Sequence, residues 1–380
     1  MSENTETRRV VIVGLGLIGG SIGLRLSAAE LPGLEVVGSD IDGSRESTAK
    51  KSGAIDRGEH DLTRAVRDAR LVIIAVPISA VRDVFTAIAP HLAEGAVVTD
   101  TASTKGEVMK WAAELLPESV SFVGGHPMAG NEQSGIDHAD AALFEGRAYC
   151  VCPTVSSPPT AIQSVVGLAQ ALGAEPVFID AEEHDVYAAA ISHLPLITAT
   201  ALFRLLRESP SWDDLGQLAS TGFRDMTRLA SGDPSMSNAI WKTNREAIIH
   251  WVDRLVEELK RLRAMLSDGQ DEELFKLFAE VKLQRDEFIA NPPRRETAAR
   301  GPEVDRGRAV LEMFVGGMVA KNVRRVSKIP EMLEARQQED GPGGEKRRLS
   351  LGEKMERGIR RDLDKMERER EEKAKSEGDR

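Results

Sequence analysis

The feature that most constrains the fold is a glycine-rich turn near the start of the chain. It follows the apolar run Val10–Val13 and opens a segment with helical periodicity. In this setting a G-x-G-x-x-G spacing predicts a dinucleotide-binding strand–turn–helix unit, because the helix start offers N–H groups and partial positive charge to a pyrophosphate. The three glycines would allow the tight turn, the close approach of the pyrophosphate and the packing of helix on strand. The cofactor-binding residues predicted here are Gly14, Gly16, Leu17, Ile18 and Gly19.

The alternation of strand and helix signals continues and predicts a doubly wound parallel sheet. Short β-branched runs that are nearly continuous in apolar residues are typical of parallel strands buried on both faces. Further strands are expected at 35–38, 71–76, 96–99 and 121–123. Two more, at 148–151 and 175–179, could extend the same sheet.

The strand signals stop at about residue 182, and long helix-period stretches follow at 186–206, 212–229 and 238–266. The predicted fold class is therefore α/β, with an N-terminal Rossmann-type sheet followed by an all-α helical domain. The predicted domains are a dinucleotide-binding domain at 8–180, a helical substrate and dimerisation domain at 181–292, and a charged C-terminal extension at 293–380 that is partly helical or disordered. The apolar helix faces exceed what one small layer would cover, which favours a homodimer.

Composition narrows the function classes. The 380 residues carry 50 Lys+Arg and 61 Asp+Glu, a net charge of −11, which argues against a nucleic-acid partner. No stretch approaches the roughly 18 consecutive apolar residues of a transmembrane helix, so no membrane partner is expected. The two cysteines, Cys150 and Cys152, would share one strand face as reduced thiols, which indicates a cytoplasmic protein. Neither has further Cys or His at ligand spacing, so no metal site is predicted.

Polar residues at the strand ends extend the predicted cofactor site. Asp40 ends the second strand, where a carboxylate accepts hydrogen bonds from the adenosine ribose and repels a 2′-phosphate. NAD is thus favoured over NADP, although Arg45 keeps NADP open. Asp42 is interpreted as a cap or turn residue. Val76 and Pro77 close the third strand and are expected to lie along the cofactor.

Two polar loops follow the fourth and fifth strands. His126 lies at the carboxyl edge of the sheet, where an imidazole can take a proton from a hydroxyl group that is being oxidised. The alternative is a histidine that only satisfies loop backbone. Ser103 could take part in the chemistry, or Ser103 or Thr104 could only cap the helix that follows.

The helical half holds a second set of polar residues. Arg228 could bind a carboxylate through its two-pronged donor geometry, or form an ion pair with Asp225 on the same helix. His193 lies in a polar interruption just before Pro195, which is expected to kink the helix; it is either a satisfied core histidine or a ligand-binding one. The pair His184–Asp185 could orient a neighbour or belong to a helix start.

These segments, in this order, resemble the prephenate and arogenate dehydrogenase family of tyrosine biosynthesis over about residues 9–290. The most specific motifs are His-Pro-Met-Ala-Gly at 126–130, Ser-His-Leu-Pro at 192–195 and Phe-Arg-Asp-Met-Thr-Arg at 223–228. The resemblance implies an NAD-linked oxidation of the ring C4 hydroxyl, coupled to loss of the ring carboxylate. With prephenate as the substrate, the product is 4-hydroxyphenylpyruvate.

The resemblance also implies roles for individual residues. His126 would accept the hydroxyl proton, and Ser103 would hydrogen-bond the same hydroxyl or orient His126. The substrate-binding residues that it implies are Arg228 for a carboxylate, Asp225 to fix Arg228, Glu132 in the same pocket, and His193.

Two departures from the family pattern lie in the substrate half. Leu196 stands where many members carry a second histidine, and Ser237 stands where a tryptophan is frequent. Arogenate activity therefore stays open. A second hypothesis is another two-domain NAD-dependent hydroxyacid dehydrogenase. Such an enzyme is expected to use a catalytic lysine on the helical domain, and segment 192–195 has no lysine. A non-catalytic NAD-binding redox sensor is the third hypothesis; His126 argues against it, because a sensor needs no proton acceptor.

Overall fold

The computed structural model describes residues 8–29, 33–130 and 133–293. The described chain divides into two compact units, 8–252 and 253–293, each treated separately below. The predicted C-terminal extension from 294 onward and the predicted site residue Glu132 lie outside the described residues.

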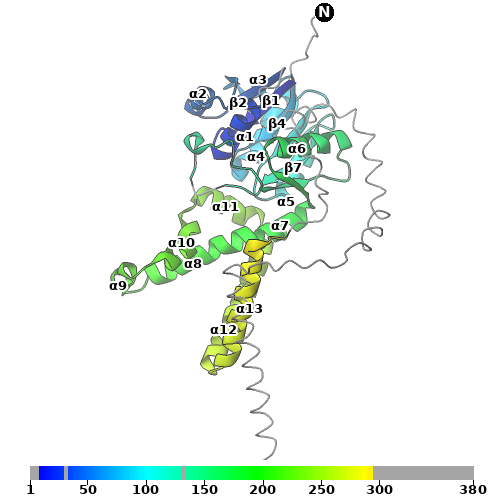
Figure 1. Cartoon of the computed structure of the whole chain (residues 1–380). Coiled ribbons are helices and arrows are strands. Elements are labelled where there is room, and N and C mark those ends of the chain that lie inside the picture. Colours follow the sequence, from blue (N-terminus) through cyan, green and yellow to red (C-terminus); the bar gives the residue numbers. More distant parts are fainter. Residues whose placement is uncertain (1–7, 30–32, 131–132, 294–380) are drawn as a thin grey trace, which may run out of the picture. The chain divides into compact units, whose positions relative to one another are not determined.

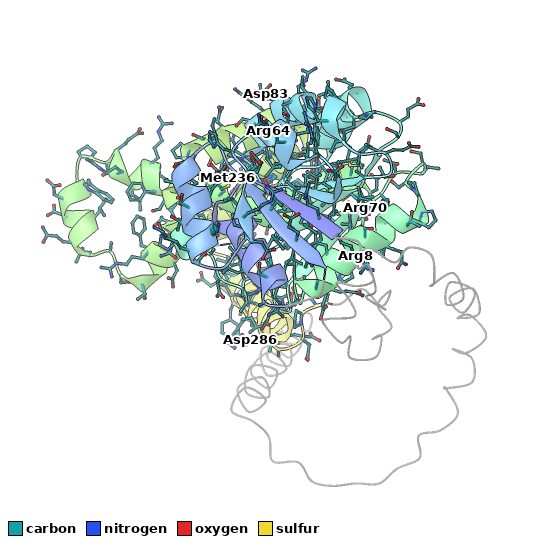
Figure 2. The ribbon with its side chains drawn as sticks, turned by 90° about the horizontal axis from the view of Figure 1, so that it is seen from above. Arg8, Arg64, Arg70, Asp83, Met236 and Asp286 are labelled. Atoms are coloured by element: carbon teal, nitrogen blue, oxygen red, sulfur yellow. The ribbon has the colours of Figure 1, made fainter. Side chains whose placement is uncertain are left out.

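The first unit is built on a six-stranded parallel sheet with the strand order β3-β2-β1-β4-β5-β6, of which Figure 1 labels β2, β1 and β4. The strands are β1 (Arg8–Val13), β2 (Leu34–Ser39), β3 (Arg57–Gly58), β4 (Ala69–Ile74), β5 (Val97–Asp100) and β6 (Ser121–Phe122). The predicted doubly wound sheet is confirmed, and β3 is an additional short strand. The order reverses between β1 and β4, and ligands bind at the carboxyl ends of strands at such a switch point. Figure 2 shows Arg8 and Arg70 together at the opposite, amino ends of these two strands.

Helices pack on both faces of this sheet because alternate side chains of each strand point to opposite faces. On β1, Ile12 packs with Ile22 in one apolar cluster, whereas Val11 packs with Phe85 in the other. The helices of this part are α1 (Leu17–Ser27), α2 (Gly43–Lys51), α3 (Leu62–Ala65), α4 (Ile78–Ile88), α5 (Gly106–Leu115) and α6 (Pro159–Ala171).

A second sheet corrects one expectation. The strands β7 (Gly124–Pro127), β8 (Ala148–Cys152) and β9 (Glu175–Phe178) form their own three-stranded sheet, so the prediction that 148–151 and 175–179 could extend the first sheet is wrong. The cause is a change of partner, because the chain leaves β5 after two paired residues of β6 and β7 then pairs antiparallel with β8. Glycine lets β7 pass close to the end of β5: a Cβ on Gly125 would lie 2.5 Å from the carbonyl oxygen of Asp100. Both cysteines are buried thiols on β8, as predicted.

The helical part starts with α7 (Ala181–Ala188), continues through a π-helical turn η3 (Ala189–His193), and passes into α8 (Leu194–Arg207). The polar interruption predicted at 191–195 thus overlaps a π turn that ends at His193, and Pro195 occupies the first turn of α8. The helix-period stretches predicted at 212–229 and 238–266 are helical, and each is divided, at Ser220 and at Asn244, where the backbone is not helical. The observed elements are α9 (Trp212–Gln217), α10 (Thr221–Thr227), the 3₁₀ turn η4 (Arg228–Ser231), α11 (Pro234–Thr243) and α12 (Arg245–Ser267).

The described part of the second unit contains the end of α12 and the helix α13 (Asp271–Ala290). Several large apolar side chains of α13 are exposed in the single chain. They are Phe275, Phe278, Val281, Phe288 and Ile289.

One helical stretch of the described chain, Ala181–Arg207, is long and apolar enough to cross a membrane by length and composition alone. Only 22% of its most apolar window is buried within this chain. Its polar residues His184, Asp185 and His193 are nevertheless buried in protein, and they make hydrogen bonds with other elements. A helix with this pattern also suits a protein whose apolar face is covered by another subunit.

Candidate active site

In the glycine turn after β1, two glycines pack closely against backbone atoms, and a third glycine borders open space. Gly14 has φ +93°, and a Cβ there would lie 2.5 Å from the carbonyl oxygen of Ala75. A Cβ on Gly19 would lie 1.9 Å from the carbonyl oxygen of Gly14, so both positions require glycine. At Gly16 a Cβ would meet no described atom within 4 Å. Gly16 precedes α1 without a side-chain cap, so the helix N-terminus can receive an anion.

Asp40 ties the end of β2 to this turn. Its Oδ2 accepts a hydrogen bond from the backbone N–H of Leu15 at 2.7 Å, and its Oδ1 accepts one from Asp42 at 2.9 Å. A carboxylate can accept more than two hydrogen bonds, so Asp40 keeps capacity for ribose hydroxyls. Arg45 lies 3.7 Å from the same carboxylate. Asp42 caps α2 through the N–H of Ser44, as predicted.

The other predicted cofactor-binding residues surround the same turn. A Cβ on Gly14 would lie 2.9 Å from Cγ1 of Val76, so the end of β4 borders the glycine turn. Pro77 follows as the exposed N-cap of α4. Leu17 is buried and Ile18 is half-buried in the first turn of α1. Their contact with a cofactor stays a prediction.

His126 belongs to β7 and begins a chain of hydrogen bonds that reaches α7. Its Nδ1 lies 2.9 Å from Nε2 of His184, and Nδ1 of His184 lies 2.8 Å from Oδ1 of Asp185. The Asp185 carboxylate also accepts the backbone N–H groups of Lys105 at 2.7 Å and Gly106 at 2.8 Å. These two N–H groups belong to the start of α5, so a residue of α7 caps α5.

That cap settles the alternative interpretation of the loop before α5. Neither Ser103 nor Thr104 caps the helix, since the hydroxyl of Thr104 lies 2.9 Å from that of Thr243 instead. Ser103 is half-buried, and among the described residues no hydrogen bond joins it to His126. Its action on the substrate hydroxyl stays a prediction.

The chain of hydrogen bonds fixes the positions of the imidazole protons. A carboxylate only accepts, so His184 donates from Nδ1 to Asp185 and accepts at Nε2. His126 must then donate from Nδ1, which leaves its own Nε2 without a proton. Burial lowers the pKa of His126 well below its ordinary value, and the nearby Lys105 cation lowers it further. His126 is therefore a neutral proton acceptor at physiological pH.

Lys105 is a buried residue of the candidate site that sequence reasoning did not single out. It is fully buried, and its Nζ binds the carboxylate of Asp100 and the carbonyl oxygen of Gly125, the latter at 2.6 Å. Asp100 also accepts the N–H of Gly125 at 3.1 Å. The ion pair thus holds the residue directly before His126. The only sequence signal was a carboxylate at a strand end five residues before a lysine.

His193 joins the same cluster from the π turn. It is 1% exposed, and burial lowers its pKa to about 4, against the opposing effect of the Asp185 carboxylate. Its Nδ1 lies 3.3 Å from Nδ2 of Asn244, a buried residue between α11 and α12 that sequence reasoning also missed. The other ring nitrogen of His193, Nε2, is buried and has no hydrogen-bond partner among the described residues.

Arg228 and Asp225 lie away from these imidazoles in the single chain. Both are exposed, on η4 and α10 respectively, and these two elements pack against α8. Figure 1 shows α10 further along the α7–α8 rod than the end where α7 meets α5. The roles of Arg228 and Asp225 toward a substrate carboxylate stay predictions.

The site has two halves. A glycine turn lies at the switch point of the parallel sheet, and the buried imidazole of His126 lies beyond the end of β5. Among the described residues no group of three His, Cys, Asp or Glu side chains is placed to hold a metal ion. Fold and site together define a two-domain, dinucleotide-dependent dehydrogenase.

Comparison with known proteins defines this class further. The family model described as prephenate dehydrogenase, nucleotide-binding domain, matches residues 25–178, and the one described as prephenate dehydrogenase, dimerization domain, matches residues 180–280. The chain belongs to the prephenate dehydrogenase family.

Relatives and solved structures agree with this assignment. The prephenate dehydrogenase of Bacillus subtilis is 34% identical over 75% of this chain and 77% of its own length. The structure of prephenate dehydrogenase from A. aeolicus with hydroxyphenyl propionate and NAD+ is 30% identical, with a TM-score of 0.70 over 75% of this chain and 100% of that one. The arogenate dehydrogenase of Synechocystis is 29% identical, with a TM-score of 0.64 over 74% of this chain and 99% of that one.

Proposed function

We propose that this chain catalyses the NAD+-dependent oxidative decarboxylation of prephenate to 4-hydroxyphenylpyruvate, a step of tyrosine biosynthesis. The observation that carries the proposal is the hydrogen-bond chain from Asp185 through His184 to His126. Oxidation of a hydroxyl group needs a proton acceptor, and this chain leaves Nε2 of His126 in the accepting form. The family assignment supplies the substrate class.

The residues at the glycine turn fit NAD+. The open side of Gly16 and the uncapped start of α1 suit a pyrophosphate, and Asp40 suits the adenosine ribose. The Asp40 carboxylate would repel a 2′-phosphate, which favours NAD+ over NADP+. When bound, the nicotinamide accepts the hydride that leaves C4 of the substrate ring.

His126 takes the proton of the C4 hydroxyl at Nε2 as the C4–O bond becomes a carbonyl. His184, which accepts the Nδ1–H of His126, and the Asp185 carboxylate behind it stabilise the imidazolium that forms. The bond from the ring to its carboxylate then breaks, CO₂ leaves, and the electron pair enters the ring to give a phenolate. The phenolate oxygen takes the proton back from the His126 imidazolium, which gives the phenol and restores the neutral base. Ser103 contacts the same hydroxyl in this proposal, and Arg228 holds a substrate carboxylate.

The test uses the purified full-length protein with prephenate or arogenate and with NAD+ or NADP+, in four pairings. We expect NADH formation and 4-hydroxyphenylpyruvate from prephenate with NAD+. Turnover with arogenate and not with prephenate would move the substrate to arogenate, the substrate named for the Synechocystis relative. Inactivity in all four pairings would overturn the proposal.

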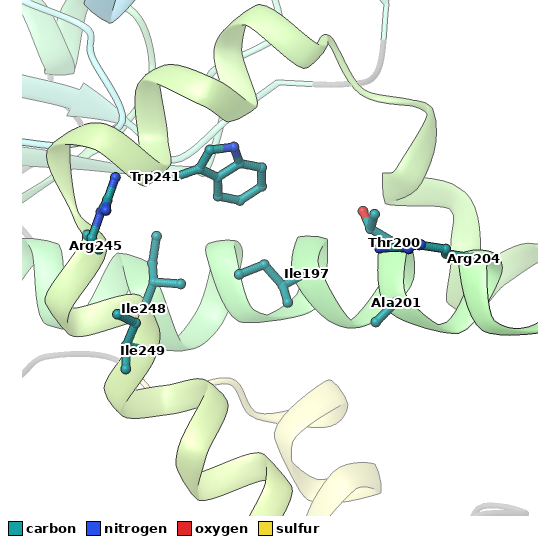
Figure 3. A pocket seen from close by; sticks show the side chains of 8 residues that line it. All are labelled: Ile197, Thr200, Ala201, Arg204, Trp241, Arg245, Ile248 and Ile249. Atoms are coloured by element: carbon teal, nitrogen blue, oxygen red, sulfur yellow. The ribbon is translucent and has the colours of Figure 1, made fainter.

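We also infer a homodimer, with the cytoplasm as its location. A groove of about 460 Å³ lies between α8, α11 and α12, and Figure 3 shows the side chains that converge on it. It is lined mainly by apolar groups, among them Ile197, Trp241 and Ile248. These residues fall within the region matched by the dimerization domain, so a second copy of this chain is the occupant proposed for the groove. The reduced state of the two buried cysteines supports the cytoplasmic location.

Light scattering on a sizing column tests the dimer. Ile249 lines the groove and is 52% exposed, so Ile249→Glu should weaken the dimer while the monomer stays folded. Val155→Glu, at a fully exposed position outside the helical part, is the control and should leave the dimer intact. A monomeric wild-type protein would contradict the inference.

A further inference from the structure

Asn244 has a defined orientation because of one carbonyl group. Its Nδ2 lies 2.7 Å from the backbone carbonyl oxygen of Asp185, which only accepts hydrogen bonds. The amide NH₂ must therefore face Asp185, and a flipped side chain would place two oxygens against each other. The second N–H of the same amide is available to Nδ1 of His193, at 3.3 Å.

This orientation determines the tautomer of His193. A ring nitrogen that faces an N–H donor has to be the unprotonated one, so Nδ1 of His193 accepts from Asn244. Since the buried ring is neutral at physiological pH, its single proton resides on Nε2. The two histidines thus differ at Nε2. His193 carries an N–H donor there, whereas Nε2 of His126 is an unprotonated acceptor.

The Nε2–H group of His193 is the unusual part of this arrangement. It is buried, and no described residue accepts its hydrogen bond. A buried donor without an acceptor is destabilising, so such groups are rare unless a ligand uses them. His193 also ends a π-helical turn, a feature that is frequent at functional sites.

We propose that Asn244 holds His193 as the Nε2–H tautomer, and that this N–H donates a hydrogen bond to a carboxylate oxygen of the substrate. The proposal rests on the proposed function for the identity of the substrate. Prephenate offers one hydroxyl and two carboxylates, and the hydroxyl proton is directed to the acceptor nitrogen of His126. A donor in the same cluster of imidazoles is complementary to a carboxylate. Asn244 acts through His193 and is a positioning residue.

Nitrogen NMR of the protein labelled with ¹⁵N-histidine tests the tautomer without any turnover. The chain has seven histidines, and the signals missing from the His193→Gln spectrum identify His193. We expect the Nε2–H form in the wild type. Asn244→Asp presents an acceptor in place of the donor and should move the proton of His193 to Nδ1. Asn238→Asp, at an exposed position on the neighbouring helix α11, should leave the wild-type tautomer. A wild-type spectrum with the proton on Nδ1 would overturn the proposal.

Steady-state kinetics tests the contact with the substrate. In Asn244→Asp and His193→Leu we expect the KM for prephenate to rise about 10- to 100-fold, the scale of a lost hydrogen bond to a charged group, with kcat and the KM for NAD+ nearly unchanged. His193→Gln keeps an N–H near the position of Nε2 and should recover part of the loss. A purely structural role would not distinguish glutamine from leucine. An unchanged KM for prephenate, or a rise in the KM for NAD+ alone, would refute the contact.

Failure of this proposal can be distinguished from failure of the proposed function. If the wild type turns over neither prephenate nor arogenate, the proposed function fails, and the NMR result still decides the tautomer. If the wild type is active and the Asn244 and His193 variants keep its KM for prephenate, only the present proposal fails.

Discussion

Nδ1 of His126 lies 2.9 Å from Nε2 of His184, and this contact decides which side of the His126 ring accepts a proton. The two residues are 58 positions apart, one on β7 and the other on α7. The Asp185 carboxylate behind them also caps α5, so the same side chain serves both the fold and the orientation of the base.

The first prediction concerns the base itself. His126→Asn removes the accepting nitrogen, so kcat should fall by about 10² or more, the scale of lost general base catalysis. Binding of NAD+, measured by calorimetry, should stay close to that of the wild type, because the glycine turn is untouched. Undiminished turnover would remove His126 from the role of base.

The second prediction concerns His184 as a positioning residue. His184→Leu cannot accept the Nδ1–H of His126, so kcat should fall about 10- to 100-fold while the KM for prephenate changes little. His184→Gln offers a carbonyl oxygen as an acceptor and should recover part of the rate. Equal losses in the two variants would indicate that only packing is at stake.

The third prediction concerns the buried ion pair of Lys105 and Asp100. Lys105→Met leaves the Asp100 carboxylate buried beside backbone N–H groups alone, which should lower the free energy of unfolding by about 3 to 5 kcal/mol. Urea denaturation measures this change. The double variant Lys105→Met with Asp100→Asn removes both charges and should regain part of the stability. If the double variant is no more stable than the single one, the two side chains are not coupled.

The double variant has a second readout in its pH profile. The Lys105 cation is one of the charges that lower the pKa of His126. In its absence the pKa of His126 should rise, so the acid limb of kcat/KM should move to higher pH. An acid limb that stays in place would mean that Lys105 does not act on the base.

The sequence predicted the parts of the molecule that depend on local pattern. The glycine spacing identified Gly14 and Gly19, where a side chain would collide with backbone atoms. Asp42 caps α2 by accepting the backbone N–H of Ser44, two residues further on. The separate sheet of β7, β8 and β9 was not predictable in this way. Strand partners depend on tertiary contacts, so a short apolar run does not predict which strand it will pair with.

The candidate site shows the same limit. His126 was a candidate from the sequence because it lies in a polar loop after a predicted strand, and His193 because it interrupts an apolar helix. Lys105 and Asn244 were missed, because their functional contacts are to Asp100, Gly125 and Asp185, which only the folded chain brings near. Hydrogen bonds between residues so far apart in the chain determine which ring nitrogens of the histidines carry protons. They produce no periodic pattern in the sequence.

The last prediction is a pH dependence of stability. The pKa of His193 is about 4 in the folded chain, below the ordinary value of 6.5, because burial disfavours the charged ring. Above pH 6.5 both states are neutral and there is no effect. As the pH falls from there toward 4, the unfolded chain binds a proton that the folded chain does not, so the free energy of unfolding decreases.

The slope expected for one such histidine is about 1.4 kcal/mol per pH unit, or about 3 kcal/mol in total by pH 4. Urea denaturation from neutral to mildly acidic pH measures the slope, to which His126 contributes in the same direction. His193→Gln removes one titrating group and should make the decline shallower by up to this amount. His250→Gln, which removes an exposed imidazole of α12, is the matched control and should keep the wild-type slope. Parallel curves for the wild type and His193→Gln would show that His193 takes up its proton equally in both states, which its burial beside Asn244 and His184 argues against.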